Sequence, residues 1–183
     1  QRDDMLFVTT HDKIRLIDKD LQEIGNWDYR EDPDKYSTGY YLSAFKSSDE
    51  VHWFGSNHGF HIYGHDNLLV HVPFREDDIL SGPGHYFVTG FYEDDEGKIW
   101  MSTFGGGVSC YSRDSKTFRH YTRKDGLAHN TCASIQGYGN QIFVSTNAGL
   151  NVINRETGGI SSFTDEDGLL SNEFAIASSF RIE

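Results

Sequence analysis

The sequence predicts an all-β fold assembled from one repeated unit of four strands, and three observations support this prediction. Short runs of apolar, β-branched and aromatic residues recur at 6–10, 51–56, 99–103 and 141–146. The runs contain Phe7, Trp53, Trp100 and Phe143, which are spaced 46, 47 and 43 residues apart. The phrase Asp-Gly-Leu-x-x-Asn occurs at 125–130 and again 42 residues later. A strand-based repeat of about 40–50 residues is typical of the blades of a β-propeller.

The predicted strands form four approximate repeats within one propeller segment over residues 1–183. The repeats cover residues 5–45, 51–92, 98–136 and 141–181. Their strands are predicted at 5–10, 13–18, 23–27, 39–45, 51–56, 59–63, 68–72, 85–92, 98–103, 108–112, 116–121, 131–136, 141–146, 149–153, 159–163 and 173–181. The Gly105-Gly106-Gly107 triplet lacks the flanking pattern of a phosphate-binding loop, so we interpret it as a hairpin turn.

The order of the strands leaves the closure of the propeller open. The chain begins with a second strand of the unit and ends with a first strand, as in propellers whose two ends share one blade. A closed ring of four blades and part of a larger ring both fit this order. We favour part of a larger ring because four blades is the low end of the range for propellers.

Composition and charge exclude several classes of partner. The chain has 28 acidic and 16 basic residues, for a formal net charge of −12. Nucleic acid is not expected as a partner, because its phosphates need clustered Lys and Arg. No run of 18 apolar residues occurs, so no direct membrane contact is expected. The charge favours a neutral or cationic ligand, although a local basic patch would suit a sulfated or uronic glycan.

No cofactor, metal or catalytic site is predicted from the residue patterns. Cys110 and Cys132 lack the spacing of metal ligands, so we expect two buried thiols, with a disulfide between them as the open alternative. The acidic stretch at 165–168 lacks the later carboxylate of a calcium loop, and we interpret it as a turn.

Histidine and tyrosine residues raise one catalytic alternative. A lyase-type pair could be formed by His85 with Tyr86 or by His61 with Tyr63, if both groups lie on one face within hydrogen-bond reach. Neighbouring residues in the predicted strand at 85–92 point to opposite faces, which disfavours the first pair. Five of the nine histidines lie between residues 52 and 71, but no Cys or carboxylate joins them at the spacing of a zinc site.

Two phrases in the third repeat carry a resemblance to a known family. The first is YEDDEGKIWMSTFGGGV at 92–108, and the second is FRHYTRKDGL at 118–127. Both resemble the two-component regulator propeller repeat, and the phrase at 163–174 is similar to the end of that family's propeller region. The resemblance is strong over 85–174 and looser before. Two features depart from the family: Ser102-Thr103 stands where Gly-Thr is usual, and only four repeats are present.

The resemblance implies a function for the chain as one part of a longer protein. The family builds the periplasmic sensor half of hybrid two-component systems, best known from gut Bacteroidetes, which detect products of polysaccharide breakdown. This implies an extracytoplasmic part of an inner-membrane protein, whose histidine kinase lies elsewhere in the parent chain. The implied partners are an oligosaccharide ligand and the remaining propeller blades and signalling domains of that chain.

Two groups of residues are candidates for binding such a ligand, because sugars bind on flat aromatic faces that polar groups surround. The first group flanks the long loop of the first repeat, beside Asp32 and Asp34, and comprises Trp27, Tyr29, Arg30, Tyr40 and Tyr41. The second group lies on loops that should share one face of the propeller, and comprises Asn57, His58, Arg75, Arg123, His129 and Asn147. Trp53 and Trp100, in contrast, are expected to fill the core between blades.

The resemblance therefore implies a non-catalytic, periplasmic, oligosaccharide-sensing segment of a hybrid two-component signalling protein. One alternative is a propeller-type glycan lyase or hydrolase, which convergent His, Tyr and Arg side chains would favour. The other is a module for protein–protein interaction or homodimer formation, which a large apolar face on an open blade would favour.

Overall fold

The computed structural model describes residues 6–9, 13–28, 41–64 and 69–176 of the chain. The chain divides into two compact units, Gln1–Tyr41 and Leu42–Glu183. Within the described residues all regular structure is β-strand, apart from two single-turn 3-10 helices. No helix in this part of the chain is long and apolar enough to cross a membrane.

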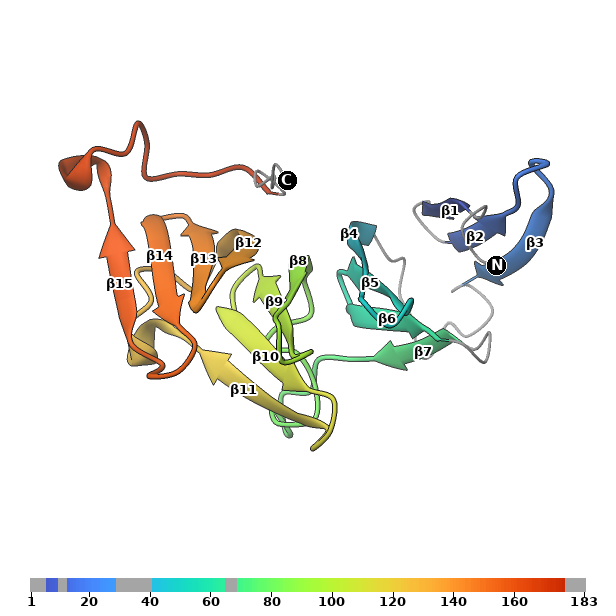
Figure 1. Ribbon diagram of the computed structural model, residues 1–183, viewed down its shortest axis with the longest axis horizontal. Coiled ribbons are helices and arrows are strands. Elements are labelled where there is room, and N and C mark those ends of the chain that lie inside the picture. The colour runs from blue at the N-terminus through green and yellow to red at the C-terminus, as the bar shows by residue number, and fades with distance from the viewer. Residues whose placement is uncertain (1–5, 10–12, 29–40, 65–68, 177–183) are drawn as a thin grey trace. The chain divides into compact units, whose positions relative to one another are not determined.

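The first unit contains a three-stranded antiparallel sheet (Figure 1). Its strands, in the order of the sheet, are β1 (Leu6–Thr9), β2 (Lys13–Ile17) and β3 (Glu23–Asp28). Ile14 and Leu16 alternate with exposed Arg15 along β2 and are buried. This alternation is typical of a strand with one buried face.

The second unit contains three four-stranded antiparallel sheets, whose strands follow the order of the chain (Figure 1). The first consists of β4 (Tyr41–Lys46), β5 (His52–Ser56), β6 (Gly59–Tyr63) and β7 (Leu69–Val72). The second consists of β8 (Val88–Glu93), β9 (Ile99–Thr103), β10 (Val108–Ser112) and β11 (Thr117–Tyr121). The third consists of β12 (Cys132–Tyr138), β13 (Gln141–Thr146), β14 (Gly149–Asn154) and β15 (Ile160–Phe163). These sheets confirm the predicted all-β, propeller-type fold.

Most predicted strand boundaries shift by one or two residues, and three predictions differ from the structure by more. The strand predicted at 85–92 begins only at Val88, because the backbone N–H of Phe87 donates to the ring of His85 instead of a strand partner. The strand predicted near 173–181 is wrong for residues 173–176, which are not in a strand, and the rest lies outside the described residues. The stretch at 165–167, interpreted as a simple turn, is a 3-10 helix (η3, Asp165–Asp167).

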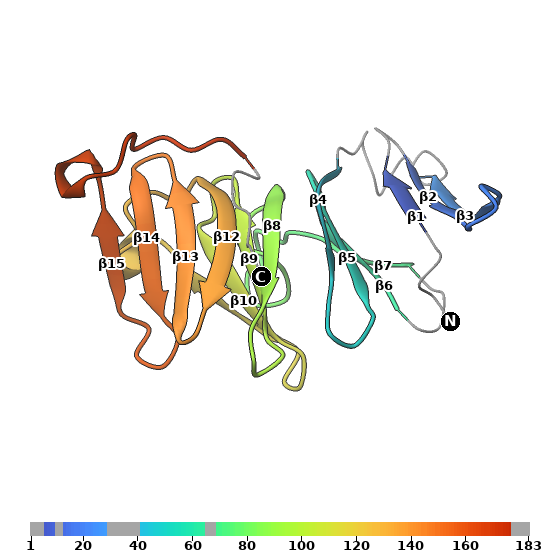
Figure 2. The same cartoon turned by 45° about the horizontal axis from the view of Figure 1, so that its top comes forward.

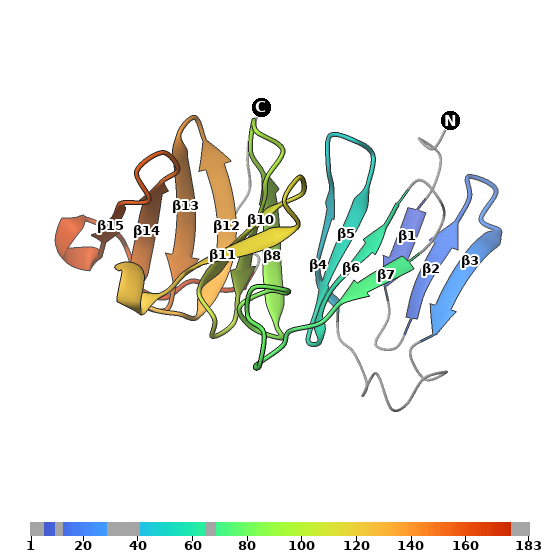
Figure 3. The same ribbon diagram turned by 90° about the horizontal axis from the view of Figure 1, so that it is seen from below.

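Two apolar clusters hold the three sheets of the second unit together. The sheet β8–β11 lies between β4–β7 and β12–β15 (Figures 1 and 3). Trp53 and Trp100 are each 2% exposed and belong to different clusters, which confirms their prediction as core between blades. Cys110 and Cys132 are buried free thiols in the second of these clusters, as expected. Burial raises the pKa of each thiol to about 12.

A polar group six residues before Trp53, and another six residues before Trp100, fixes the orientation of each indole ring. The indole N–H of Trp100 donates to Asp94 at 2.8 Å, and that of Trp53 donates to the hydroxyl of Ser47 at 3.0 Å. Asp94 also accepts from the backbone N–H groups of Glu96 and Lys98. The acidic residue of the repeat therefore closes the hairpin turn and satisfies a buried indole at the same time.

A glycine closes the turn between the second and third strands of each sheet in the second unit. Gly59, Gly107 and Gly149 have φ of 104°, 78° and 101°, a region that side chains disfavour. A Cβ added at Gly107 would lie 2.1 Å from the carbonyl oxygen of Tyr121, so neighbouring strands leave no room for one. The repeated glycine thus sets where each turn ends.

Candidate functional site

The candidate site lies along one edge of the three sheets, which we call the loop edge. It consists of the turns between second and third strands and the loops that follow the fourth strands, at 57–58, 73–87, 104–107, 122–131, 147–148 and 164–172. In Figure 2 this edge is at the top of the β12–β15 sheet, where β13 turns into β14 and β15 leads to η3. The opposite edge, at the bottom, holds the hairpins β12–β13 and β14–β15.

Backbone hydrogen bonds join successive loops along this edge. The N–H of Gly59 donates to the carbonyl of Tyr86, and the N–H of Phe104 donates to the carbonyl of Phe87. The carbonyl of Asn130 then accepts from Gly105 and Gly107, at 3.1 and 2.9 Å. The N–H of Asn147 donates to the carbonyl of Thr131. The loops predicted to share one face are therefore bonded to one another.

The Asp-Gly-Leu-x-x-Asn phrase builds one of these loops, which carries Arg123 and His129. The helix η2 (Arg123–Asp125) begins with a capping box, in which Thr122 and Asp125 bond each other's backbone N–H groups. Leu127 is buried, and the side chain of Asn130 accepts from the N–H of Arg123 at 2.7 Å. The second copy repeats this bond between Asn172 and the N–H of Asp165. The phrase thus specifies a rigid loop that leaves Arg123 exposed.

The loop at 73–87 is tied to the second sheet by a pair that sequence reasoning missed. The N–H of Gly84 donates to the hydroxyl of Ser109, which lies 3.0 Å from Nδ1 of His120. Nε2 of His120 lies 2.6 Å from the carbonyl oxygen of Ile79. Because that carbonyl only accepts, His120 carries its proton on Nε2, and Nδ1 accepts from Ser109. One nitrogen of the imidazole therefore bonds the loop directly, and the other bonds the serine that holds Gly84 of the same loop.

The tied loop, together with Phe104 from the turn after β9, presents a group of aromatic rings in contact at the loop edge. We call this group, formed by Phe74, His85, Tyr86, Phe87 and Phe104, the aromatic platform. The rings of His85 and Tyr86 stack with centroids 4.0 Å apart, and Tyr86 lies 5.2 Å from Phe87. The rings of Phe87 and Phe104 lie 6.2 Å apart. Tyr86 and Phe104 are each 44% exposed, so the platform offers two large aromatic side chains to solvent.

The environment of His85 favours its neutral form. Burial lowers the pKa of His85 below its usual value. Its Nδ1 accepts from the N–H of Phe87 at 3.2 Å. A neutral imidazole stacked on Tyr86 extends the flat part of the platform without adding a charge.

The predicted loop residues flank the platform. Asn57 and His58 occupy the turn that bonds to Tyr86, and Arg75 follows Phe74. On the other side, Phe104 pairs with Thr131, whose N–H donates to the ring of His129. Within the second predicted group, Arg75, Arg123 and Asn147 are exposed. The structure places the second predicted group on one edge, but the aromatic residues between its members were not predicted.

The first predicted group is mostly not described. Tyr29, Arg30 and Tyr40 lie outside the described residues, and so does the side chain of Trp27 in β3. Tyr41 begins β4 and is half-buried. The role of this group as a ligand site stays a prediction.

The geometry of the catalytic alternatives differs from their sequence-based description. His85 and Tyr86 lie in a loop with stacked rings, and not on opposite faces of a strand as expected. His61 and Tyr63 share a face of β6, but they are only 2% and 3% exposed. Ser109 meets His120 at the distance of a nucleophile and its base, yet Ser109 is 0% exposed and its oxygen accepts from Gly84. We therefore assign the Ser109–His120 pair to loop positioning.

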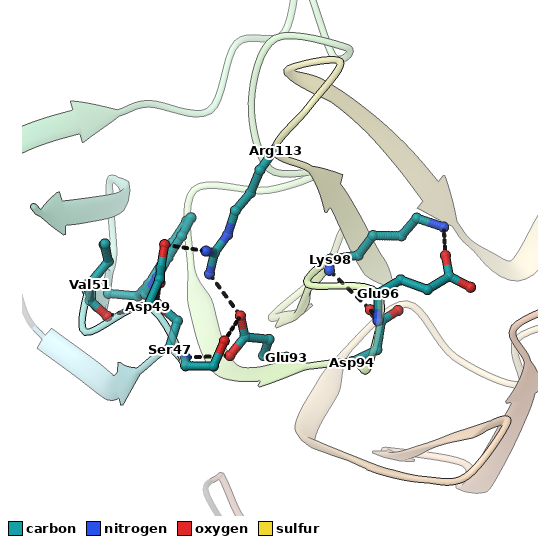
Figure 4. Close-up of polar contacts among 10 residues, drawn as sticks. Ser47, Asp49, Val51, Glu93, Asp94, Glu96, Lys98 and Arg113 are labelled. Atoms are coloured by element: carbon teal, nitrogen blue, oxygen red, sulfur yellow. Dashed lines mark hydrogen bonds and ion pairs between the residues drawn. The ribbon is translucent and has the colours of Figure 1, made fainter.

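The opposite edge, which we call the hairpin edge, carries paired charges between sheets (Figure 4). Arg113 bonds Asp49 of the preceding sheet at 2.6 Å and Glu93 at 3.1 Å. Arg155, 42 residues later, bonds Asp94 at 3.2 Å and also Asp95. A polar cavity of about 390 Å³ lies here, between Glu93, Glu96, Lys98 and Arg113 among others. The charged groups of this cavity bond each other within one sheet. The bond of Arg113 to Asp49 and the bonds of Arg155 to Asp94 and Asp95 join neighbouring sheets, so this edge serves as a clamp between sheets.

No group of three or more His, Cys, Asp or Glu side chains suited to a metal ion occurs among the described residues. In the acidic stretch at 165–168, the side chains form local contacts instead. Asp165 accepts from the side chain of Asn172, and Asp167 accepts from Thr164.

Comparison with protein families identifies one matching stretch. Residues 81–105 match the family model of the two-component regulator propeller. This stretch includes four of the platform residues and the bond between Asp94 and Trp100. It confirms the resemblance inferred from the sequence. No curated protein sequence matches the chain.

Solved structures share the fold at low sequence identity. Two are structures of the extracellular domain of BT4673 from B. thetaiotaomicron, described as a one-component system in one case and a hybrid two-component system in the other. The first matches with a TM-score of 0.71 and 18% identity, over 94% of this chain and 23% of that one. The second matches with 0.59 and 21%, over 74% and 20%. Virginiamycin B lyase from Staphylococcus aureus matches with 0.64 and 20%, over 87% and 51%. The chain thus spans less than a quarter of the BT4673 domain.

Proposed function

We propose that the chain is a non-catalytic segment of a periplasmic sensor region, and that the aromatic platform binds a polysaccharide-derived oligosaccharide. The match to the two-component regulator propeller and the similarity to extracellular domains of such systems support the sensor role. In this proposal a histidine kinase in the parent chain transmits the signal, and the remaining blades complete the sensor. Fold alone does not fix a function, so the proposal of a ligand must rest on the residues of the site.

The observation that carries the proposal is the exposed aromatic platform with polar groups on both sides. Tyr86 and Phe104 each leave nearly half of their surface in solvent, on loops that hydrogen bonds hold in place. The apolar face of a pyranose ring packs on such side chains, and its hydroxyl groups bond to surrounding polar atoms. His58, Arg123, His129 and Asn147 are the candidates to supply those atoms.

The charge of the chain narrows the class of ligand. A formal net charge of −12 disfavours long polyanions. The loop edge contains Arg75, Arg123 and Lys124, but Glu76, Asp77, Asp78 and Asp125 lie within the same loops. Because the two signs are mixed, we infer a neutral oligosaccharide.

The experiment that tests the proposal is a thermal-shift screen of the whole extracellular region and of this chain against neutral and sulfated oligosaccharides. A ligand at 100 times its dissociation constant stabilises a protein by about 2.7 kcal/mol, which is a measurable shift. We expect a shift with a neutral glycan, and mass spectrometry should recover that glycan unchanged.

Three other outcomes contradict parts of the proposal. Cleavage of the glycan would favour a lyase or hydrolase. A shift with sulfated glycans alone would contradict the neutral ligand. The absence of any shift across the panel would contradict sugar sensing and favour a protein partner.

A further inference from the structure

A second cavity opens on the hairpin edge, between the sheet β8–β11 and the hairpin that joins β14 to β15. Its volume is about 160 Å³, and its apolar wall includes Trp100, Cys110 and Tyr121. These three residues belong to the apolar cluster between the two sheets, and the rings of Trp100 and Tyr121 stack with centroids 5.5 Å apart. We call this space the arginine cavity. Because it is smaller than the pockets that hold drug-sized ligands, it suits a small molecule.

The charged part of the wall contains more cations than carboxylates. Five charged side chains line the cavity, namely Asp94, Glu96, Lys98, Arg119 and Arg155. Lys98 bonds Glu96, as Figure 4 shows, and Arg155 bonds Asp94 at 3.2 Å. Arg119 bonds no carboxylate among the residues that the structure describes. One positive charge of the wall is therefore left without a partner.

Arg119 is held in a position that leaves its N–H groups available. It pairs with Cys110 across β10 and β11, so its side chain lies on the same face as the apolar wall. The guanidinium carbon lies 4.7 Å from the centroid of the Tyr121 ring. A Cβ added at Gly158 would lie 2.7 Å from Nη2 of Arg119, so the guanidinium reaches the hairpin of the next sheet. An arginine stacked on an aromatic ring keeps its planar fork of donors free for an anion.

Arg155 adds a second donor that has no acceptor. Its side chain is only 11% exposed, and its Nε–H is buried without a hydrogen-bond partner among the described residues. Buried N–H groups are usually satisfied, and an exception calls for an explanation. Two of the guanidinium groups that line the cavity thus have N–H groups for which the described part of the protein provides no acceptor.

The charge and the apolar wall together define the class of ligand. One unpaired cation matches one negative charge, whereas the carboxylates of Asp94 and Glu96 repel a dianion such as sulfate. The apolar wall gains nothing from an inorganic ion, but it can cover a short carbon chain.

We propose that the arginine cavity binds a small organic monocarboxylate. The carboxylate accepts two parallel hydrogen bonds from the guanidinium of Arg119, and the carbon chain packs on Trp100 and Tyr121. The site lies on the edge opposite to the aromatic platform. It is therefore independent of the proposed binding of a glycan.

The experiment is an NMR titration of this chain with sodium butanoate at constant ionic strength. We expect saturable shifts of the indole N–H of Trp100 and of the backbone N–H groups of Cys110 and Arg119. The N–H of Tyr86 on the loop edge should not shift. Butanamide, butylamine and sulfate should each bind at least tenfold more weakly, because they lack either the negative charge or the carbon chain.

A pair of arginine variants separates the site from general attraction of anions. Arg119→Gln should weaken the binding of butanoate at least tenfold, because it removes the unpaired cation and keeps the apolar wall. Arg123→Gln changes an exposed arginine on the loop edge and should leave the affinity unchanged. Urea unfolding of both variants verifies that they fold.

Three results would each overturn the proposal. One is the absence of a saturable shift at Trp100, Cys110 and Arg119. Another is an equal affinity of the unmodified chain for sulfate or butanamide. The third is an unchanged affinity for butanoate in the Arg119→Gln variant.

Discussion

At the scale of single residues, Asp94 stabilises the fold through its hydrogen bonds and not through its charge alone. Asp94 is only 6% exposed and accepts from Trp100, Glu96 and Lys98, with Arg155 beside it. Ser47 holds the equivalent indole in the preceding sheet with one hydroxyl. The comparison of Asp94 with Ser47 predicts which substitutions position 94 tolerates.

We expect Asp94→Ala to lower the free energy of unfolding by about 3 kcal/mol, because it leaves the buried indole N–H of Trp100 and two backbone N–H groups of the hairpin turn without their acceptor. Asp94→Ser should recover at least about 1 kcal/mol of this loss, because a hydroxyl serves this role for Trp53. Urea unfolding of the two variants checks the prediction. Equal stability of both variants would contradict it.

The buried His61 predicts a dependence of stability on pH. Burial, followed by the nearby charges of His71 and His58, lowers the pKa of His61 well below 6.5. The unfolded chain therefore binds a proton that the folded chain excludes, and stability falls as the pH drops below about 6.5. We expect His61→Asn to flatten this dependence between pH 7.5 and 5.5, as measured by urea midpoints. An unchanged slope in the variant would show that other groups cause it.

At the scale of elements, the arginine contacts between sheets should affect the stability of the fold, and the ties of the loop at 73–87 should affect the local opening of that loop. Arg113 joins two sheets through its bond to Asp49, bonds Glu93 of its own sheet, and lies over the ring of Trp53. The pair between Lys98 and Glu96 has similar chemistry but lies within one hairpin. These two contacts form a matched comparison.

We expect Arg113→Ala to lower the free energy of unfolding by about 1 kcal/mol, since the pairs are partly exposed and the ring contact adds to them. Lys98→Ala should cost less than about 0.5 kcal/mol, because an exposed pair within one hairpin contributes little. Thermal unfolding at low and high salt measures both. A larger effect of Lys98→Ala would contradict the assignment of the hairpin edge as a clamp between sheets.

The Ser109–His120 pair predicts the behaviour of the loop at 73–87. His120→Ala removes both the bond to Ile79 and the partner of Ser109, so amide exchange within 79–87 should become at least tenfold faster. Thr117→Ala, an exposed change on the same strand, should leave exchange in this loop unaffected. Unchanged exchange in the His120→Ala variant would contradict the positioning role.

At the scale of the whole molecule, local patterns and long-range contacts differ in how well the sequence predicts them. The spacing of Phe7, Trp53, Trp100 and Phe143 predicted the strands, because alternation and turn residues are local signals. The meeting of Ser109 with His120 depends on the register of β10 and β11, and their contact with Gly84 depends on how a distant loop crosses them. Such contacts have no signature along the chain.

The loop edge shows the same division within the candidate site. Its location followed from the order of the strands, and the structure bonds these loops together. The aromatic platform was missed because residues 85–87 have the composition of a strand, while their actual conformation is set by ring stacking and by Phe104 from another loop. The sequence therefore predicted where the candidate site lies, at the loop edge, better than it predicted which aromatic residues form it.

The central claim is that the aromatic platform binds a glycan, and calorimetric titration of three proteins with the glycan identified by the screen tests it most directly. The proteins are the unmodified region, the Tyr86→Ala/Phe104→Ala variant and the Tyr138→Ala control, which removes an exposed tyrosine from the opposite edge. We predict that the double variant binds at least tenfold more weakly, a loss of about 1.4 kcal/mol, while the control binds as the unmodified protein does. Equal affinities in all three proteins would show that the platform is not the binding site.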